Sequence, residues 1–390
     1  MELKFLSEKR IKGRMGKEVD FIVREIDLSG NILDLEKEIN YGENGEHGLF
    51  IVEKFNWNTI DLLKEYSKRL GVSAKRFGCA GNKDRKAVTT QLISCFKQFQ
   101  LPQVKDARWK FAGKGNEVKM GDLLGNNFEI KAYSEKNQIE STAVNEIFEE
   151  TKGRIPNYFG EQRFGSMRGN TAKIGEKIIR WDFRGAVEDY LTSAGEKEKD
   201  EIKEARKRLK DEGDYSSALQ YFPKYLTYER TLLSFLAQNP RDHINALRKM
   251  PRKLVLMFVH AFQAQIFNEI VCERAKNSFE KIEGDVFCEK NAYGFPDEEN
   301  KKEEGQFLLE RIIGYELAPA NEIEKQILEK HEVKQEDFKI KRFPEISSRG
   351  TFRPAIFNII DFSFEENKNL FKFSIPKGSY ATVVMGQFLE

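Results

Sequence analysis

Alternation of apolar and polar positions predicts strands near both ends of the chain. Phe21–Ile26 and Leu49–Val52 are short strand-like segments that flank a turn-rich segment at 41–45. Runs bounded in this way are typical of β-strands. Phe371, Phe373 and Ile375 alternate with polar residues and predict a late strand. The remaining predicted strands lie at 90–96, 128–133 and 380–384.

Helical periodicity predicts helices between these strands. One begins at Asn58 or Thr59, either of which can cap it, and ends at Gly71. Its apolar residues are expected on one face: Ile60, Leu63 and Leu70. A second helix has apolar residues at i, i+3 and i+4 and ends at Gly153: Val144, Ile147 and Phe148. This alternation indicates an α+β domain with a mixed or antiparallel sheet.

The pattern changes to mainly helical after about residue 171. Helices are predicted at 171–182 and 183–191, and the strongest helical pattern covers 253–275. The charge-dense run 196–212 has helical composition and predicts a solvated helix face. Segment 277–345 mixes loops with short elements. The simplest architecture is an α+β domain built from both chain ends, interrupted by a mainly helical α+β insertion.

Composition limits the classes of function. The 390 residues suffice for two domains, each with its own core. The formal net charge is only +2, so a site for a polyanion must be a local basic patch. Four scattered cysteines and four scattered histidines give no zinc pattern and suit a reduced cytoplasmic protein. The charged segment 1–14 lacks an apolar core, and the longest apolar run, Leu254–Val259, is too short to cross a membrane.

The strongest candidate for chemistry is the segment Gly81–Gln91, whose sequence is GNKDRKAVTTQ. Asp84 lies among the cations Lys83, Arg85 and Lys86. Neighbouring bases keep a carboxylate ionised, as a nucleophile or base requires, and they can also hold phosphate groups. The alternative interpretation is a charged turn in front of a strand, with Asp84 in surface ion pairs.

Two further segments decide between these interpretations. Segment 155–165 reads IPNYFGEQRFG, and segment 376–383 reads PKGSYATV. Together with Gly81–Gln91, and in this order, they resemble the TruD family of tRNA pseudouridine synthases. The resemblance covers nearly the whole chain. It implies a pseudouridine synthase catalytic domain at 1–170 and 345–390, with a TRUD-type inserted domain at 171–344.

The resemblance also implies a function. Family members are isomerases that convert uridine to pseudouridine in tRNA, with position 13 of the D-arm as the expected target. The reaction needs no cofactor, no metal and no obligate protein partner. Asp84 matches the catalytic aspartate of the family motif G-x-K-D-x-x-A-x-T-x-Q. Lys83 would contact phosphate or orient Asp84, although a solvated side chain is the simpler alternative.

The second motif supplies the expected substrate contacts. Phe159 matches the aromatic residue of N-Y-F-G and would stack on the flipped base, whereas core packing is the alternative. Asn157 would bond to Asp84 or to the uracil edge, and Arg163 would pair with phosphate or support Asp84. Arg353 suits RNA contact or, equally, a structural loop. Because phenylalanine lacks a hydroxyl group, another group must remove the carbon 5 proton.

Two polar residues of the long helix are expected to have structural roles, and one position near the N-terminus differs from the usual family sequence. Gln263 and Asn268 lie beside the apolar face of the long helix and are expected to bond to backbone groups or to partners at a domain interface rather than to substrate. Near the N-terminus, Met15 stands where the family usually has a basic residue, so Arg14 or Lys17 would supply the charge.

Two alternative functions remain open from the sequence. One is an RNA-binding or RNA-folding module that has lost catalysis. The other is a metal-dependent RNA hydrolase that uses Asp84 with Glu161, although no second carboxylate has a convincing spacing from Asp84.

Overall fold

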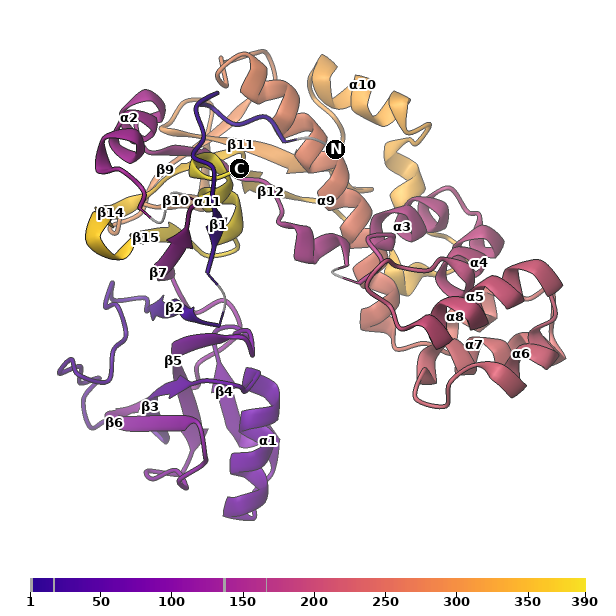
Figure 1. Cartoon of the computed structure of the whole chain (residues 1–390), viewed down its shortest axis with the longest axis horizontal. Coiled ribbons are helices and arrows are strands. Elements are labelled where there is room, and N and C mark those ends of the chain that lie inside the picture. The colour runs from indigo at the N-terminus through magenta and orange to yellow at the C-terminus, as the bar shows by residue number, and fades with distance from the viewer. Residues whose placement is uncertain (1–2, 17, 136–137, 166) are drawn as a thin grey trace. The chain divides into compact units, whose positions relative to one another are not determined.

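The computed structural model describes residues 3–16, 18–135, 138–165 and 167–390, without the side chain of Glu18. It divides the chain into two compact units (Figure 1). The main segments of the first, here called the helical unit, are Pro156–Cys288 and Glu298–Ala355. The second, the sheet unit, consists of Phe5–Ile155, Glu289–Asp297 and Ile356–Glu390.

A nine-stranded sheet forms the sheet unit, with the order β14-β15-β7-β2-β5-β3-β6 and with β1 on β7 and β4 on β5. The central pair β2 and β5 is parallel, and their other partners are antiparallel, which confirms the predicted mixed sheet. The strands are β1 (Arg14–Met15), β2 (Glu18–Ile26), β3 (His47–Lys54), β4 (Phe77–Cys79), β5 (Ala87–Phe96), β6 (Ala107–Gly115), β7 (Gly125–Tyr133), β14 (Ile360–Glu365) and β15 (Leu370–Pro376).

Helix α1 (Thr59–Leu70) packs on this sheet and has the predicted ends. Asn58 caps its N-terminus by accepting a hydrogen bond from the amide of Asp61, and Gly71 ends it in the left-handed conformation, with φ 65°. The predicted face is wrong in part, because Ile60 is exposed and Leu62 is buried together with Leu63. Helix α2 (Ser141–Thr151) lies where the second helix is predicted.

The last element is a helix rather than the predicted strand at 380–384. Helix α11 (Ala381–Phe388) follows the turn at Gly378, and it buries Val383, Val384 and Phe388. The β-branched residues Thr382, Val383 and Val384 favour a strand locally. Burial of apolar side chains on the helix outweighs this weak preference.

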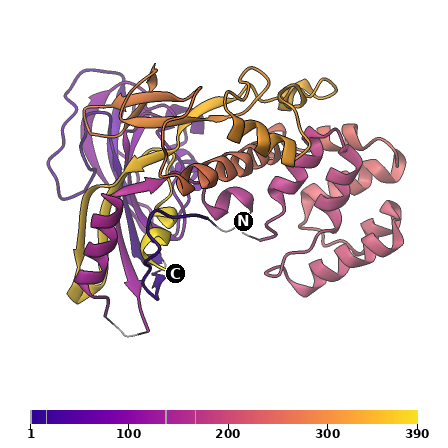
Figure 2. The same cartoon turned by 90° about the horizontal axis from the view of Figure 1, so that it is seen from above.

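Eight α-helices are described in the helical unit, and they include those predicted at 171–191 and 253–275. They are α3 (Thr171–Ile179), α4 (Phe183–Thr192), α5 (Asp200–Glu212), α6 (Tyr215–Tyr221), α7 (Thr227–Gln238), α8 (His243–Arg248), α9 (Arg252–Lys276) and α10 (Glu322–Lys330). The long helix α9 is visible in Figure 2. Gly175 of α3 lies against it so closely that a β-carbon there would be 1.9 Å from the carbonyl oxygen of Phe258. Glycine therefore permits the close packing of these two helices.

Helix α9 is long and apolar enough, by length and composition, to cross a membrane. Its most apolar 18-residue window has a mean hydropathy of 1.4, but 72% of that window is buried inside the protein. The apolar run Leu254–Val259 is much shorter than the helix, because His260 ends the run and Gln263 and Asn268 interrupt the apolar sequence further along. Burial inside the protein is typical of the central helix of a folded core.

Short strands complete the fold. A four-stranded sheet has the order β10-β9-β11-β12, and β13 pairs with β8 in a separate two-stranded sheet. Their bounds are β8 (Arg154–Pro156), β9 (Val286–Lys290), β10 (Pro296–Lys302), β11 (Phe307–Ile312), β12 (Thr351–Pro354) and β13 (Ile356–Asn358).

The two compact units divide the chain at other points than the sequence suggests. Their boundaries follow Ile155 and Ala355, whereas the predicted insertion is 171–344 and the predicted catalytic domain is 1–170 with 345–390. The assignment of catalytic and inserted domains stays a prediction.

The composition of the charged run 196–212 predicts a solvated helix face, but the run includes a buried arginine. Arg206 of α5 is 1% exposed, and its guanidinium donates hydrogen bonds to Glu198, at 3.1 and 3.2 Å, and to Glu229, at 2.8 Å. It also donates to the carbonyl groups of Tyr190 and Leu191. A buried guanidinium needs such partners, so this arginine joins three segments of the helical unit.

A second polar cluster joins α3, α9 and α10. The imidazole of His331 lies 3.0 Å from Glu269 and 3.4 Å from Glu176, and Lys330 lies 2.7 Å from Glu269. The hydrogen bond with Glu269 raises the pKa of His331, although burial opposes the shift. Burial favours a higher pKa for Glu269, but hydrogen bonds from His331, Lys330 and Gln265 lower it to about 2.

The His331→Gln variant is expected to lose about 1–3 kcal/mol of unfolding free energy at pH 6 and less at pH 9. Because the folded-state pKa of His331 is raised, its stabilisation is complete below the ordinary pKa of 6.5 and is lost as pH rises through the folded-state value. Urea denaturation of both proteins at both pH values measures this difference. Equal losses at pH 6 and pH 9 would contradict the assignment of a charged His331.

Candidate functional site

The predicted catalytic residue lies on an exposed loop between β4 and β5. Asp84 is exposed, and Arg85 and Lys86 form the turn that leads into β5. Since β5 pairs with β2 on one side and with β3 on the other, the loop leaves the centre of the sheet. A rigid strand therefore fixes one end of the segment that carries Asp84.

Lys83, next to the exposed Asp84, is buried. It is 8% exposed, so the solvated alternative is wrong. Its ammonium lies 3.3 Å from the buried carboxylate of Glu25 on β2 and donates a hydrogen bond to Asn126 on β7. Burial raises the pKa of Glu25, and the charge of Lys83 opposes that shift. This geometry suits the predicted role of Lys83 in orienting Asp84, and both that role and its contact with phosphate stay predictions.

Buried polar side chains hold the backbone of the same loop. The amide of Lys83 donates to the hydroxyl of Thr59 at 2.9 Å, and that hydroxyl donates to Gln91 at 2.7 Å. The amide group of Gln91 in turn donates to the carbonyl oxygen of Gly81 at 3.2 Å. The last residue of the motif, Gln91, therefore supports its first residue across the loop.

Lys54 was not predicted from the sequence, and its ammonium donates to the carbonyl oxygens of Lys83 and Asp84. One signal was available. Phe50 and Val52 precede Lys54 at alternate positions of β3, and both belong to the core beneath α1. Alternation along a strand places Lys54 on that same core-facing side.

A hollow of about 260 Å³ lies beside the Asp84 loop. Arg85 contributes to it from the loop, and the indole of Trp57 lines it while donating a hydrogen bond to the carbonyl of Lys105 at 2.9 Å. Its other lining residues are Asn56, Asn58, Asp61 and Asp106. The sheet unit thus presents one aromatic ring, two cationic residues (Arg85 and Lys105) and two carboxylates around a hollow beside the candidate catalytic loop.

The residues of the second motif lie together in the helical unit. The side chain of Asn157 donates to the carbonyl of Pro354 at 2.9 Å and accepts from Arg353 at 2.8 Å. Asn268 of α9 accepts from the amide of Phe159 at 2.7 Å and donates to its carbonyl at 2.9 Å. This two-point contact fixes the backbone of Phe159, and it confirms the structural role expected for Asn268.

The ring of Phe159 is 9% exposed and lies among cations and another ring. The guanidinium of Arg353 is 4.3 Å from the ring centroid and that of Arg163 is 5.4 Å away. Phe267 of α9 packs edge-to-face against it at 5.4 Å. Cations within about 6 Å of an aromatic face are attracted to it. The predicted residues Asn157, Phe159, Arg163 and Arg353 therefore form one cluster.

Gln263 of α9 also has the structural role that the sequence predicts. Its side-chain amide donates to the carbonyl of Ile313 at 2.7 Å. At the N-terminus, Met15 pairs with Ala132 within the sheet, and the guanidinium of Arg14 lies 5.4 Å from the ring of Tyr133. The alternative cation, Lys17, lies outside the described residues.

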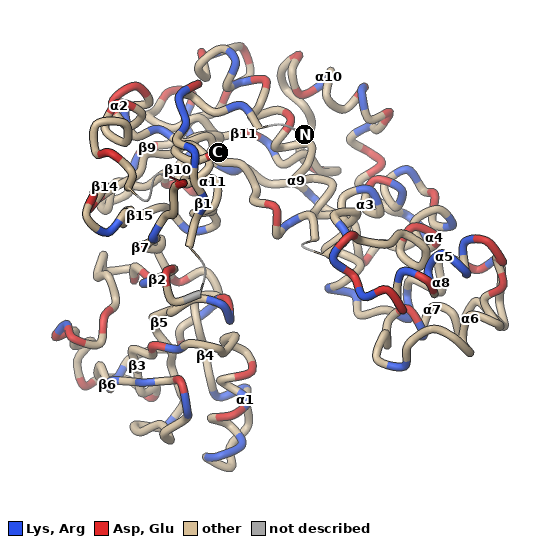
Figure 3. The backbone as a smooth tube through the Cα atoms, in the orientation of Figure 1, with Lys and Arg blue, Asp and Glu red and all other residues tan. Residues whose placement is uncertain are grey.

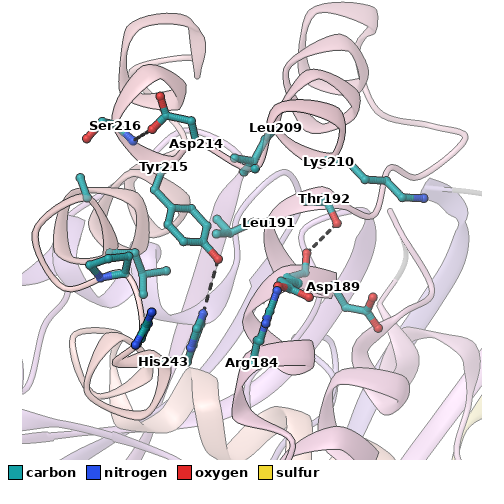
Figure 4. A pocket seen from close by; sticks show the side chains of 16 residues that line it. Arg184, Asp189, Leu191, Thr192, Leu209, Lys210, Asp214, Tyr215, Ser216 and His243 are labelled. Carbon is teal, nitrogen blue, oxygen red and sulfur yellow. Dashed lines mark hydrogen bonds and ion pairs between the residues drawn. The ribbon is translucent and has the colours of Figure 1, made fainter.

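Another hollow, of about 990 Å³, lies among α4 to α8 (Figure 4). The hydroxyl of Tyr215 is 3.4 Å from the imidazole of His243, and burial lowers the pKa of His243. The charged residues that line this hollow include both cations and carboxylates: Arg184, Glu188, Asp189, Lys210, Asp214 and Arg241. It contains none of the residues predicted from the sequence, and its mixed charge does not favour a polyanion.

Charge is mixed along both units (Figure 3), in agreement with the formal net charge of +2. The four cysteines are thiols and are not joined in disulfides, and burial raises the pKa of Cys95 to about 11, although Arg76 opposes the shift. Among the described residues, no group of three or more His, Cys, Asp and Glu side chains is placed to hold a metal ion.

Comparison with known proteins identifies the family. The family described as "tRNA pseudouridine synthase D (TruD)" matches residues 1–388. A relative from Methanosarcina mazei, named "Probable tRNA pseudouridine synthase D", is 33% identical and aligns over 91% of this chain and 90% of its own. A relative of the same name from Methanopyrus kandleri is 35% identical, with 90% and 87% covered.

The fold gives the same result. A crystal structure of a TruD protein from Methanosarcina mazei superposes with a TM-score of 0.80 at 31% identity, covering 99% of this chain and 95% of that one. The match includes both units and confirms the predicted α+β fold class. The chain belongs to the TruD family of tRNA pseudouridine synthases.

Proposed function

We propose that this enzyme isomerises uridine 13 in the D-arm of tRNA, with Asp84 as the catalytic nucleophile or base. One observation carries the proposal. Asp84 presents an exposed carboxylate from a loop whose backbone is held at Gly81, Lys83 and Asp84 by buried side chains. Such a loop combines access to substrate with a fixed direction, which catalysis requires.

The proposed reaction breaks the bond between N1 of uracil and C1′ of the ribose and forms a bond between C5 and C1′. The proton on C5 leaves, and N1 gains a proton, so no oxidant or reductant is consumed. Asp84 would act as nucleophile or base on the ribose or on the uracil to bring about this exchange of bonds. Lys83 and its partner Glu25 would hold the Asp84 loop against β2 during this step.

The cluster around Phe159 is proposed to receive the flipped uracil. Extruding a stacked nucleotide costs a few kcal/mol, and stacking on an aromatic ring recovers about 1–3 kcal/mol. Arg353 and Arg163 beside that ring are proposed to meet RNA phosphates, and Asn157 would position Arg353 through their hydrogen bond. A cytoplasmic location remains a prediction for this enzyme.

Tritium release from tRNA transcripts labelled at carbon 5 of uridine tests the proposal. Wild-type protein should release tritium from a transcript that carries uridine 13. It should release none from the matched transcript in which cytidine replaces that uridine. Equal release from both transcripts would place the target elsewhere in the tRNA.

A further inference from the structure

Lys54 is a buried cation at the end of β3. It is 1% exposed, and its ammonium donates hydrogen bonds to three carbonyl oxygens: those of Trp57 at 2.6 Å, Asp84 at 2.9 Å and Lys83 at 3.1 Å. An ammonium group has three N–H bonds, so these contacts use all of them. One side chain thus joins the end of β3, the segment before α1 and the Asp84 loop.

We propose that Lys54 is a positioning residue of the synthase, which fixes the Asp84 loop through its backbone carbonyl groups. The inference rests on the proposed catalytic role of Asp84. Because Lys54 bonds to the main chain at Asp84, it constrains the direction of that carboxylate through the backbone. It also bonds to the main chain at Trp57, which lines the adjacent hollow, so one group fixes both sides of this surface.

The geometry explains why lysine occupies this position. Three carbonyl oxygens from separate segments converge on one point, and a compact ammonium can donate to all three. The planar guanidinium of arginine donates in one plane, and a neutral side chain such as methionine donates none. Loss of the ammonium would leave buried carbonyl groups without their donor and would release the loop.

Protonation of Lys54 matters for the same reason. Burial lowers the pKa of Lys54 to about 8, while the charge of Asp84 raises it and that of Lys83 lowers it further. Its neighbours in register, Thr89 on β5 and Ala107 on β6, carry no charge. A neutral amine keeps only two N–H bonds and turns a lone pair toward the carbonyl oxygens. The loop should therefore loosen as pH rises through about 8.

Single-turnover kinetics at saturating enzyme, measured on a uridine-labelled tRNA transcript, test the proposal. At pH 7 the Lys54→Met variant should react about 100-fold more slowly than wild type, because a misplaced catalytic group costs about this factor. Its dissociation constant for tRNA should change less than about threefold, a small free-energy difference. The matched control Lys64→Met removes an exposed lysine of α1 and should react like wild type.

The pH profile separates positioning from a merely structural role. The wild-type rate should fall as pH rises through about 8, whereas the residual rate of Lys54→Met should not change across that range. A wild-type rate that stays constant from pH 7 to 9.5 would overturn the proposal. The pH profile of the wild-type rate needs no variant, so it tests the proposed role of Lys54 even if Lys54→Met fails to fold.

Asp84→Asn, assayed in parallel, separates this inference from the proposed function. An inactive Asp84→Asn with a fully active Lys54→Met would refute the role of Lys54 alone. An active Asp84→Asn would refute the proposed function itself, and with it the basis for a positioning lysine.

Discussion

The Asp84→Asn variant should lose pseudouridine formation by at least about a thousandfold, the scale seen when a principal catalytic group is removed. Asparagine has the same shape as aspartate but cannot act as the nucleophile or base. The contacts that hold the loop use the backbone of Asp84 and its neighbours, so they should persist in the variant. Binding of tRNA should therefore stay within tenfold of wild type, about 1.4 kcal/mol.

Tritium release and filter binding, measured on the same protein preparation, check both parts of this expectation. The matched control is Lys86→Gln, which removes an exposed cation from the same loop. It should weaken tRNA binding in a salt-dependent manner and leave the single-turnover rate of bound tRNA nearly unchanged. Wild-type turnover by Asp84→Asn would show that the nucleophile is assigned wrongly.

The Phe159→Leu variant should react about 5–150-fold more slowly than wild type, the factor that corresponds to a lost stacking energy of about 1–3 kcal/mol. Leucine fills much of the apolar space beside Phe267 but has no aromatic face for uracil. The change to leucine is preferable to alanine because the ring is 9% exposed and a cavity would destabilise the unit.

The Phe159→Tyr variant provides the contrast, since it keeps the aromatic face. Its single-turnover rate should stay well above that of Phe159→Leu, provided that thermal unfolding shows both variants folded. Phe267→Leu removes the edge-to-face neighbour and should have a smaller effect on the rate. If Phe159→Leu reacts like wild type, core packing is the correct interpretation of Phe159 and the base stacks elsewhere.

Much of the fold was predictable because local signals agree with the final packing. The strand-like segments in β2 and β3 and the alternation along β15 match strands of the sheet, and the caps Asn58 and Gly71 define the ends of α1. Strand β6 (Ala107–Gly115) was missed, although Trp109 and Phe111 alternate with Arg108 and Lys110 in its sequence. Exposed cations on a strand at the sheet edge dilute the apolar pattern.

Helix α11 could not be predicted from local preference, because its β-branched residues favour a strand while the packed core favours a helix. The burial of Arg206 could not be predicted either, because its partners come from other segments of the chain. A charged residue in a charge-dense helix predicts a solvated position, and only the fold brings Glu198 and Glu229 to its guanidinium.

Some residues of the candidate site are indicated by sequence motifs, and others are indicated only by the fold. Asp84 and Phe159 could be proposed from the sequence because each lies in a motif that resembles those of the family. The function of Lys54 depends on carbonyl oxygens at Trp57, Lys83 and Asp84, which come from separate segments. Every residue has a backbone carbonyl oxygen. The sequence therefore does not indicate which carbonyl oxygens lie next to Lys54 in the fold.

Position-resolved mapping of pseudouridine tests the central claim most directly. A tRNA transcript would be incubated with wild type or with Asp84→Asn, treated with a carbodiimide that marks pseudouridine, and sequenced by primer extension. We expect one stop, caused by pseudouridine at position 13, with wild type and none with Asp84→Asn. The same stop with both proteins, or no pseudouridine at position 13 with wild type, would contradict this account.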